Sequence, residues 1–152
     1  MGKRYIKDIQ LDLPEDEVQS IMRRFLSTNR FEMKTSSDGN PYYVLGENSL
    51  RSYCFFQYHY KDGCLHMEAW LGLGKAEEGL TGWGSVVEKS TYLERVHRLI
   101  EELLALLPAG HPVVVAIRKE LVHEKRSNQA GIVFMIVMLC LFGIMYAVAK
   151  YS

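Results

Sequence analysis

Side chains of the kind that bind metal ions gather around one predicted β-hairpin. The pair Asp62-Gly63 is typical of a two-residue hairpin turn, because glycine accepts a positive φ at little cost. With this turn, His59 lies opposite His66, and Cys64 and Glu68 fall on the same face of the hairpin. Thiolate, imidazole and carboxylate groups are zinc ligands, and directly opposed residues lie about 4.5–5.5 Å apart at Cβ. Zinc bound by Cys64, His59 and His66 is one interpretation. An ordinary solvated sheet face is the alternative, because no C-x-x-C or H-x-x-x-H spacing is present.

The same register predicts a binding surface on this face of the hairpin. Phe55 lies opposite Trp70, and Gln57 lies opposite Glu68. An aromatic patch on an uncovered sheet is typical of a binding surface. The alternative is burial by residues 113–117 or by a second copy of the chain.

The opposite face of the hairpin is almost entirely apolar or aromatic, so we expect helices to cover it. Cys54 belongs to this face and Cys64 to the other, which makes a disulfide between them geometrically improbable. The expected pairs on the covered face are Tyr60/Leu65, Tyr58/Met67, Phe56/Ala69 and Cys54/Leu71.

A glycine-rich loop, expected over residues 72–85, places Trp83 between two glycines. An exposed tryptophan in such a loop covers a ligand or partner pocket in one interpretation, and folds back onto the sheet edge in the other. The loop lacks the G-x-x-x-x-G-K-[ST] pattern of a phosphate-binding loop. No catalytic spacing occurs elsewhere, so we expect a binding protein rather than an enzyme, with no cofactor other than the zinc alternative.

Alternating and helical periodicities define the elements that position these residues. The apolar stripe of the first helix contains Val18, Ile21, Met22, Phe25 and Leu26. In the second helix, Thr91 and Glu94 form a capping box, and His97 is interpreted as a core histidine. Residues 113–117 are mostly β-branched and favour a short strand, with a helix as the alternative. The expected strands are 5–13, 30–36, 42–47, 50–61 and 65–73, and the expected helices begin at 14 and 91.

The order strand, helix, four strands, helix predicts an α+β fold, an antiparallel sheet with helices on one face. Over residues 5–107 this order resembles one half of the TATA-binding-protein fold and, more loosely, the helix-grip folds. The stretches Met67-Glu68-Ala69-Trp70 and Gly79-Leu80-Thr81-Gly82 resemble those of uncharacterised single-span bacterial proteins with a cytoplasmic domain. That resemblance implies a cytoplasmic domain attached to a membrane, and it implies no activity.

Residues 130–149 contain no charge and are long enough, as a helix, to cross a bilayer core of about 30 Å. We therefore expect one C-terminal transmembrane helix. Four basic residues precede it and only Lys150 follows, which favours a cytoplasmic N-terminal domain. The expected organisation is an α+β domain over 1–117, a charged juxtamembrane connector over 118–129, the span over 130–149 and a tail over 150–152. Within the span, Cys140, Gly143 and Ala147 lie near one side and predict helix–helix packing.

Composition limits the class of partner. The formal net charge is zero, whereas nucleic-acid-binding surfaces are basic, so no nucleic acid is expected. The expected partners are the lipid bilayer and a protein. The protein is either a different chain or a second copy of this one. The sequence thus favours a membrane-tethered cytoplasmic binding or adaptor domain with an unidentified ligand. The alternative is a small membrane-associated enzyme, metal-dependent through the cysteine and histidine residues above.

Overall fold

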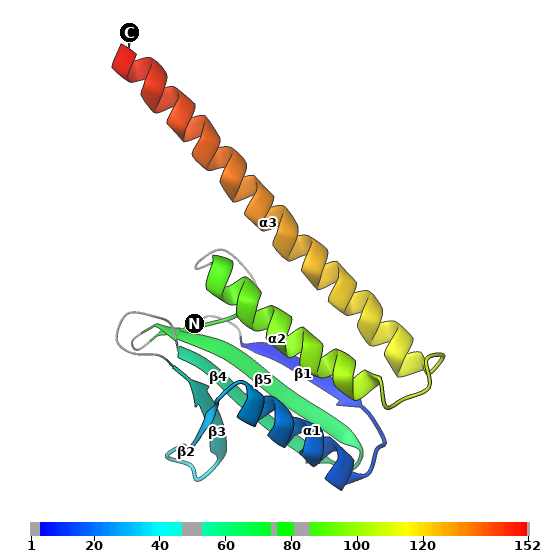
Figure 1. Ribbon diagram of the computed structural model, residues 1–152. Helices are drawn as coiled ribbons and strands as arrows, with labels where there is room; N and C mark the ends of the chain where they lie inside the picture. Colours follow the sequence, from blue (N-terminus) through cyan, green and yellow to red (C-terminus); the bar gives the residue numbers. More distant parts are fainter. Residues whose placement is uncertain (1–3, 47–52, 74–75, 81–85, 152) are drawn as a thin grey trace.

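The computed structural model describes residues 4–46, 53–73, 76–80 and 86–151, and the chain folds into an antiparallel sheet with three helices (Figure 1). Trp83 and most of the expected glycine-rich loop lie outside these residues. The elements are β1 (Tyr5–Gln10), α1 (Glu15–Thr28), β2 (Glu32–Thr35), β3 (Pro41–Leu45), β4 (Tyr53–Lys61), β5 (Cys64–Leu73), β6 (Ala76–Glu78), α2 (Val86–Leu104) and α3 (Pro112–Tyr151).

The sheet has the order β1-β5-β4-β3-β2, and β6 pairs with β5 beyond the end of β1. Every pairing is antiparallel, and Figure 1 shows α1 and α2 side by side over the same face. The expected α+β class, with helices on one face of an antiparallel sheet, is therefore confirmed. The strand β6 is a correction, because residues 76–78 were expected in a loop. Its sequence Ala-Glu-Glu carries no strand signal, and pairing with β5 alone creates the strand.

The central hairpin has the predicted register. Lys61 pairs with Cys64, His59 with His66 and Phe55 with Trp70. Asp62 and Gly63 both have positive φ, 50° and 76°, which is the conformation that a two-residue turn of this type requires. The Gly63 carbonyl also accepts hydrogen bonds from the backbone N–H groups of Leu11 and Asp12 at 2.9 and 3.0 Å, so the turn is joined to the end of β1.

The core lies between the helices and the predicted apolar face of the sheet. Phe56, Leu65, Met67, Ala69 and Leu71 are buried there. The apolar stripe expected in α1 is buried in full. Their spacing of three and four residues places them on one helical face. The α2 residues in this core are Tyr92, Leu93, Val96, Leu99, Ile100, Leu103 and Leu104.

The second helix begins earlier than expected. Thr91 is an exposed residue inside α2, which starts at Val86, so the capping box at Thr91 is wrong. No proline or glycine separates Gly84 from Thr91, and the helix therefore continues back toward the glycine. Hydroxyl and carboxyl residues three apart also occur inside helices, which is why the pattern was misleading.

The third helix, α3, runs without interruption for 40 residues from Pro112 to Tyr151 (Figure 1). Residues 113–117 are thus helical, as the alternative interpretation had it. Val114, Ile117 and Leu121 are buried in the domain core, and this burial at helical spacing overrides the β preference of a valine run. The charged segment 118–129 is part of the same helix.

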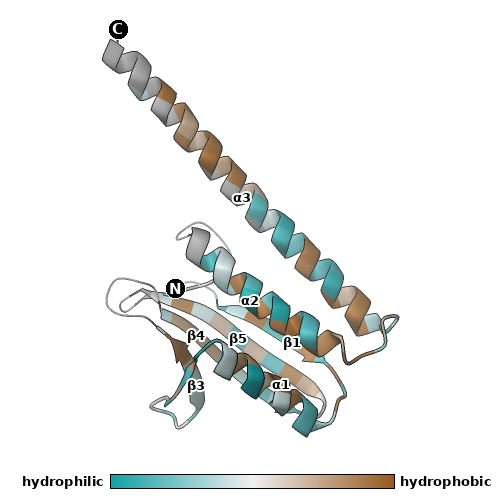
Figure 2. Cartoon of the chain, in the orientation of Figure 1, coloured by the Kyte–Doolittle hydropathy of each residue, from teal (hydrophilic) through white to brown (hydrophobic). Residues whose placement is uncertain are grey.

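The transmembrane helix expected over residues 130–149 is wrong. Among the residues that the structure describes, no helix is both long enough and apolar enough to cross a membrane. The apolar window is not a helix of its own, because it continues a helix whose earlier turns are charged. Figure 2 shows this change along α3, from alternating hydrophilic and hydrophobic residues near the domain to mainly hydrophobic residues among those described farther out.

Candidate functional site

The candidate site is a pocket of about 440 Å³ on the face of the sheet opposite the helices, called here the open face. This face carries Phe55, Gln57 and His59 of β4, and His66, Glu68 and Trp70 of β5. The turn between β2 and β3 lines one part of the pocket and β6 another. The lining residues are Arg4, Ser36, Ser37, Asn40, Tyr42, Phe55, Gln57, Trp70, Gly72 and Glu77.

Four of these side chains form a row across neighbouring strands, the aromatic row, which consists of Arg4, Trp70, Phe55 and Tyr42. The Phe55 and Trp70 rings are stacked, with centroids 5.3 Å apart and planes within 6° of parallel. The Arg4 guanidinium carbon lies 4.0 Å from the centroid of the Trp70 ring, and the Tyr42 and Phe55 centroids are 6.2 Å apart. Each residue comes from a different strand or its end, so the sheet register determines the row. Such contacts stabilise by about 0.5–1.5 kcal/mol per aromatic pair.

Gly72 leaves room for this stacking. A Cβ atom at position 72 would lie 2.5 Å from Cε2 of Phe55. Any residue other than glycine at position 72 would therefore displace the Phe55 ring. The glycine is a structural requirement of the pocket.

Two carboxylates hold Arg4 over Trp70. The Arg4 guanidinium donates to Glu77 at 2.7 and 3.1 Å and to Glu68 at 2.8 Å. The hydrogen bonds with Glu77 are the largest cause of a raised pKa for Arg4, which partial burial opposes. Burial alone would raise the pKa of Glu68, but its hydrogen bonds with Arg4 and His66 bring that pKa below its ordinary value. The two acids thus fix the position of a permanently charged cation.

His66 lies beside this network and contacts two carboxylates. Its Nδ1 is 2.6 Å from Asp8 Oδ1 and its Nε2 is 3.1 Å from Glu68 Oε1. The hydrogen bond with Asp8, and then that with Glu68, raises the pKa of His66. Within the described ranges, no three His, Cys, Asp or Glu side chains are grouped so as to hold a metal ion. Cys64, His59 and His66 share the open face as the sequence predicted, but the zinc interpretation gains no support there.

The predicted binding residues divide into three groups. Phe55, Trp70 and Gln57 line the pocket, and Glu68 supports it by holding Arg4. Trp83 lies outside the described residues. Sequence reasoning missed Arg4, Tyr42 and Glu77, because their place depends on how β1, β3 and β6 pair with the hairpin. One signal was available for Tyr42. Neighbouring residues of a strand point to opposite faces, so Tyr42 lies on the open face because Tyr43 lies on the covered one.

A second polar cluster joins α3 to the sheet and to α2. The Tyr5 hydroxyl donates to Glu124 at 2.9 Å, Lys7 Nζ lies 2.8 Å from both Glu120 and Glu124, and His97 Nε2 lies 2.9 Å from Glu124. Burial would raise the pKa of Glu124, but hydrogen bonds from His97, Lys7 and Tyr5 lower it to about 2. His97 is mostly buried with a partner, as expected of a core histidine. This cluster holds α3 against the sheet and α2.

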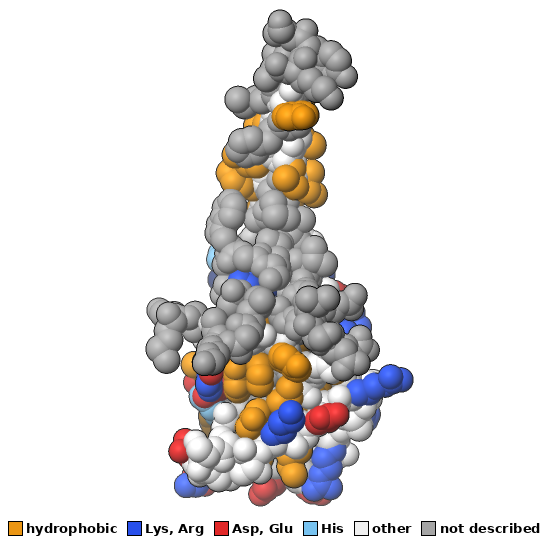
Figure 3. Space-filling view, turned by 90° about the vertical axis from the view of Figure 1, so that its left-hand side faces the viewer, with side chains coloured by type: hydrophobic (Ala, Val, Ile, Leu, Met, Phe, Trp, Pro, Cys, Tyr) orange, Lys and Arg blue, Asp and Glu red, His pale blue; other side chains and the backbone are white. Residues whose placement is uncertain are grey.

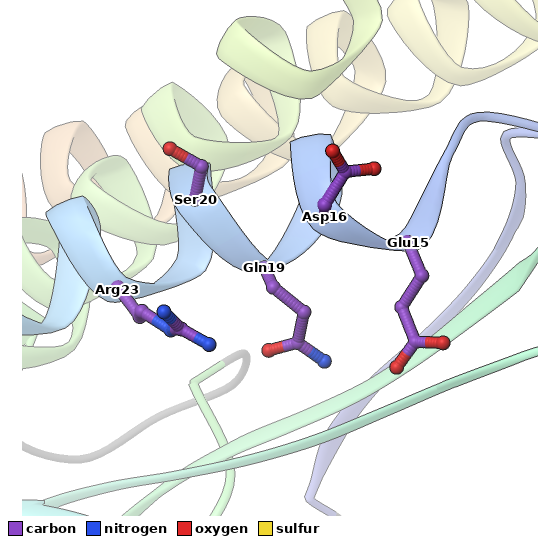
Figure 4. A pocket seen from close by; sticks show the side chains of 5 residues that line it. All are labelled: Glu15, Asp16, Gln19, Ser20 and Arg23. Atoms are coloured by element: carbon purple, nitrogen blue, oxygen red, sulfur yellow. The ribbon is translucent and has the colours of Figure 1, made fainter.

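A larger depression, about 580 Å³, lies along α1 (Figure 4). All its lining residues come from this one helix. Glu15, Gln19 and Arg23 point to one side of α1, while Asp16 and Ser20 point to the other. Because these side chains do not converge on a common point, the depression is a weaker candidate than the open-face pocket.

The predicted packing residues of the far part of α3 are only partly described. Cys140 is exposed on α3, and the side chains of Gly143 and Ala147 lie outside the described set. Helix–helix packing through these three residues stays a prediction.

Comparison with known proteins adds no assignment: no family model, no curated protein and no solved structure matches the chain. The pocket is therefore the main evidence for function. Its aromatic side chains, neutral hydrogen-bonding groups and internally paired charges suit binding more than bond-making chemistry.

Proposed function

We propose that this chain is a membrane-associated binding protein. It binds a ligand or protein partner in the open-face pocket, and the far part of α3 contacts lipid. The observation that carries the proposal is the aromatic row, a stacked pair of rings under a fixed arginine in a pocket that the helices leave uncovered.

The pocket has the composition of a recognition site. Phe55 and Tyr42 are partly exposed, and Asn40, Gln57 and two serines add neutral hydrogen-bonding groups. Apolar side chains with a few well-placed polar groups are characteristic of ligand sites. The row is also rigid, since Arg4 is held by Glu68 and Glu77, and a preformed site loses little conformational entropy on binding.

The surface of α3 supports membrane association. Basic residues Arg118, Lys119, Lys125 and Arg126 are exposed on its first part, and such residues are attracted to the anionic lipids of a cytoplasmic leaflet. Figure 3 shows hydrophobic side chains around the described outer part. The exposed apolar residues there are Val133, Phe134, Ile136, Val137, Leu139, Leu141, Ile144 and Tyr146.

Site-specific photo-crosslinking tests the binding function. We would replace Tyr42 by p-azidophenylalanine, which has nearly the same shape, in the full chain expressed in its own cells. The expected result is a discrete adduct that disappears when Phe55→Leu is added. The matched control places the same group at Tyr53, which is exposed on the same face but does not line the pocket, and it should give several-fold less adduct. Equal labelling at both positions would contradict the proposal.

A further inference from the structure

We infer that the open-face pocket binds an extended, uncharged peptide segment that contains proline. This inference rests on the proposed function and names its ligand class. Proline-rich segments form a left-handed extended helix with no internal hydrogen bonds, and proteins recognise them with grooves lined by aromatic rings. Three features of the pocket favour such a ligand.

The first feature is that other side chains already cover the Trp70 ring. Trp70 carries Arg4 over its ring and Phe55 parallel to it, and its exposed fraction is only 6%. A flat ligand such as a nucleobase would need an open ring face, which Trp70 does not offer. Tyr42 and Phe55, whose ring planes are 31° apart, both line the pocket instead, and an aliphatic ring needs only such aromatic surface to pack against. Proline supplies such a ring in every residue of a proline-rich helix.

The second feature is the supply of hydrogen-bond donors. In a proline-rich helix the carbonyl groups point outward and have no partner within the peptide. Tyr42 and Gln57 line the pocket, and neither side chain forms a hydrogen bond within the described part of the chain. A hydroxyl and an amide can both donate to carbonyl oxygens. Asn40 and the two serines of the β2–β3 turn lie at the same pocket.

The third feature is that the charged side chains at the pocket already have partners. Arg4 and Glu77 are the charged residues that line the pocket in the described structure, and they are hydrogen-bonded to each other. Arg4 also contacts Glu68, so its positive charge faces two carboxylates. An acidic or basic peptide would meet no unpaired charge here. An uncharged segment avoids the cost of desolvating a charge without a partner.

The test is a peptide titration of the full chain. Trp83→Phe leaves Trp70 as the only tryptophan, since the chain has two. The probes are four end-capped decapeptides: decaproline, a glycine-serine repeat, a glutamate-rich peptide and a lysine-rich peptide. We expect decaproline alone to change the Trp70 emission spectrum in a saturable way. Phe55→Leu should weaken this binding about tenfold, or more.

Two further variants keep the inference falsifiable. Tyr42→Phe keeps the ring and removes the hydroxyl, and should weaken decaproline binding about threefold to tenfold. Met33→Leu, an exposed change on β2 outside the pocket, should leave the affinity unchanged. Binding of a charged peptide in place of decaproline, with the same dependence on Phe55, would overturn the ligand class while leaving the binding function intact. Failure of all four peptides, together with no adduct at Tyr42, would overturn both proposals.

Discussion

Some single residues of the open face leave no room for a larger side chain. The clearest is Gly72, where a Cβ atom would lie 2.5 Å from Phe55 Cε2. Gly72→Ala should displace the Phe55 ring from Trp70 and lower the free energy of unfolding by about 1–3 kcal/mol, the usual cost of overpacking. Urea unfolding measures the stability, and the near-ultraviolet circular dichroism of the aromatic row should weaken.

Gly110 provides the matched control for this substitution. A Cβ atom there would have no neighbour within 4 Å, and its φ is not in the left-handed region. Gly110→Ala should therefore leave stability unchanged or raise it by up to about 1 kcal/mol. Equal losses at both glycines would show that the Phe55 contact is not the cause.

Glu124 gives a pH prediction at the same scale. Its pKa is lowered from 4.5 to about 2, because hydrogen bonds from His97, Lys7 and Tyr5 outweigh burial. A carboxyl with a depressed folded-state pKa stabilises the fold above its unfolded pKa. That stability is lost as the pH falls from about 4.5 toward 2. The loss should be on the order of 2 kcal/mol, since the group is partly solvated.

Urea unfolding at pH 7 and at pH 3 measures this loss, with Glu124→Gln as the comparison. The glutamine variant should be less stable at pH 7 and should lose less stability between the two pH values. If the glutamine variant lost as much stability between pH 7 and pH 3 as the unmodified chain, Glu124 would have its ordinary pKa in the folded state.

At the scale of the elements, the structure attaches the first part of α3 to the domain, whereas the sequence suggested a connector from residue 118. Leu121 is buried in the core and its neighbour Val122 is about half exposed. Leu121→Ala should lower the free energy of unfolding by about 2–4 kcal/mol, as deletion of a buried leucine side chain does. Val122→Ala should change it by less than about 0.5 kcal/mol. Chemical unfolding of the two variants would decide whether this turn of α3 packs in the core.

Local signals explain which elements could be predicted. The hairpin register followed from Asp62-Gly63, because a two-residue turn determines every pair along both strands. The register brought Phe55, Gln57 and Trp70 to one face, which is the predicted half of the site. Arg4, Tyr42 and Glu77 could not be found in this way, since pairing between distant strands places them. The valine run at 113–115 became helical for the same non-local reason, burial of Val114 and Ile117 against the domain.

At the scale of the whole molecule, α3 extends well beyond the domain, with the C-terminus at its far end (Figure 1). We expect the outer part to contact lipid, so the chain should co-float with vesicles of phosphatidylcholine and phosphatidylserine. The double variant Ile136→Glu/Leu139→Glu places two charges among the exposed apolar side chains and should reduce the floated fraction several-fold. Met33→Glu, at an exposed position on β2 and away from α3, is the control and should float like the unmodified chain.

The most direct test of binding in the open-face pocket is to map where the partner captured at Tyr42 contacts the chain. Backbone amide shifts of the labelled chain, recorded with and without that partner, report which residues it touches. We predict the largest changes at Tyr42, Gln57, Gly72 and Glu77, which line the open-face pocket, and small changes along α1. Changes concentrated on α1 or α2, with the pocket residues unaffected, would contradict the account.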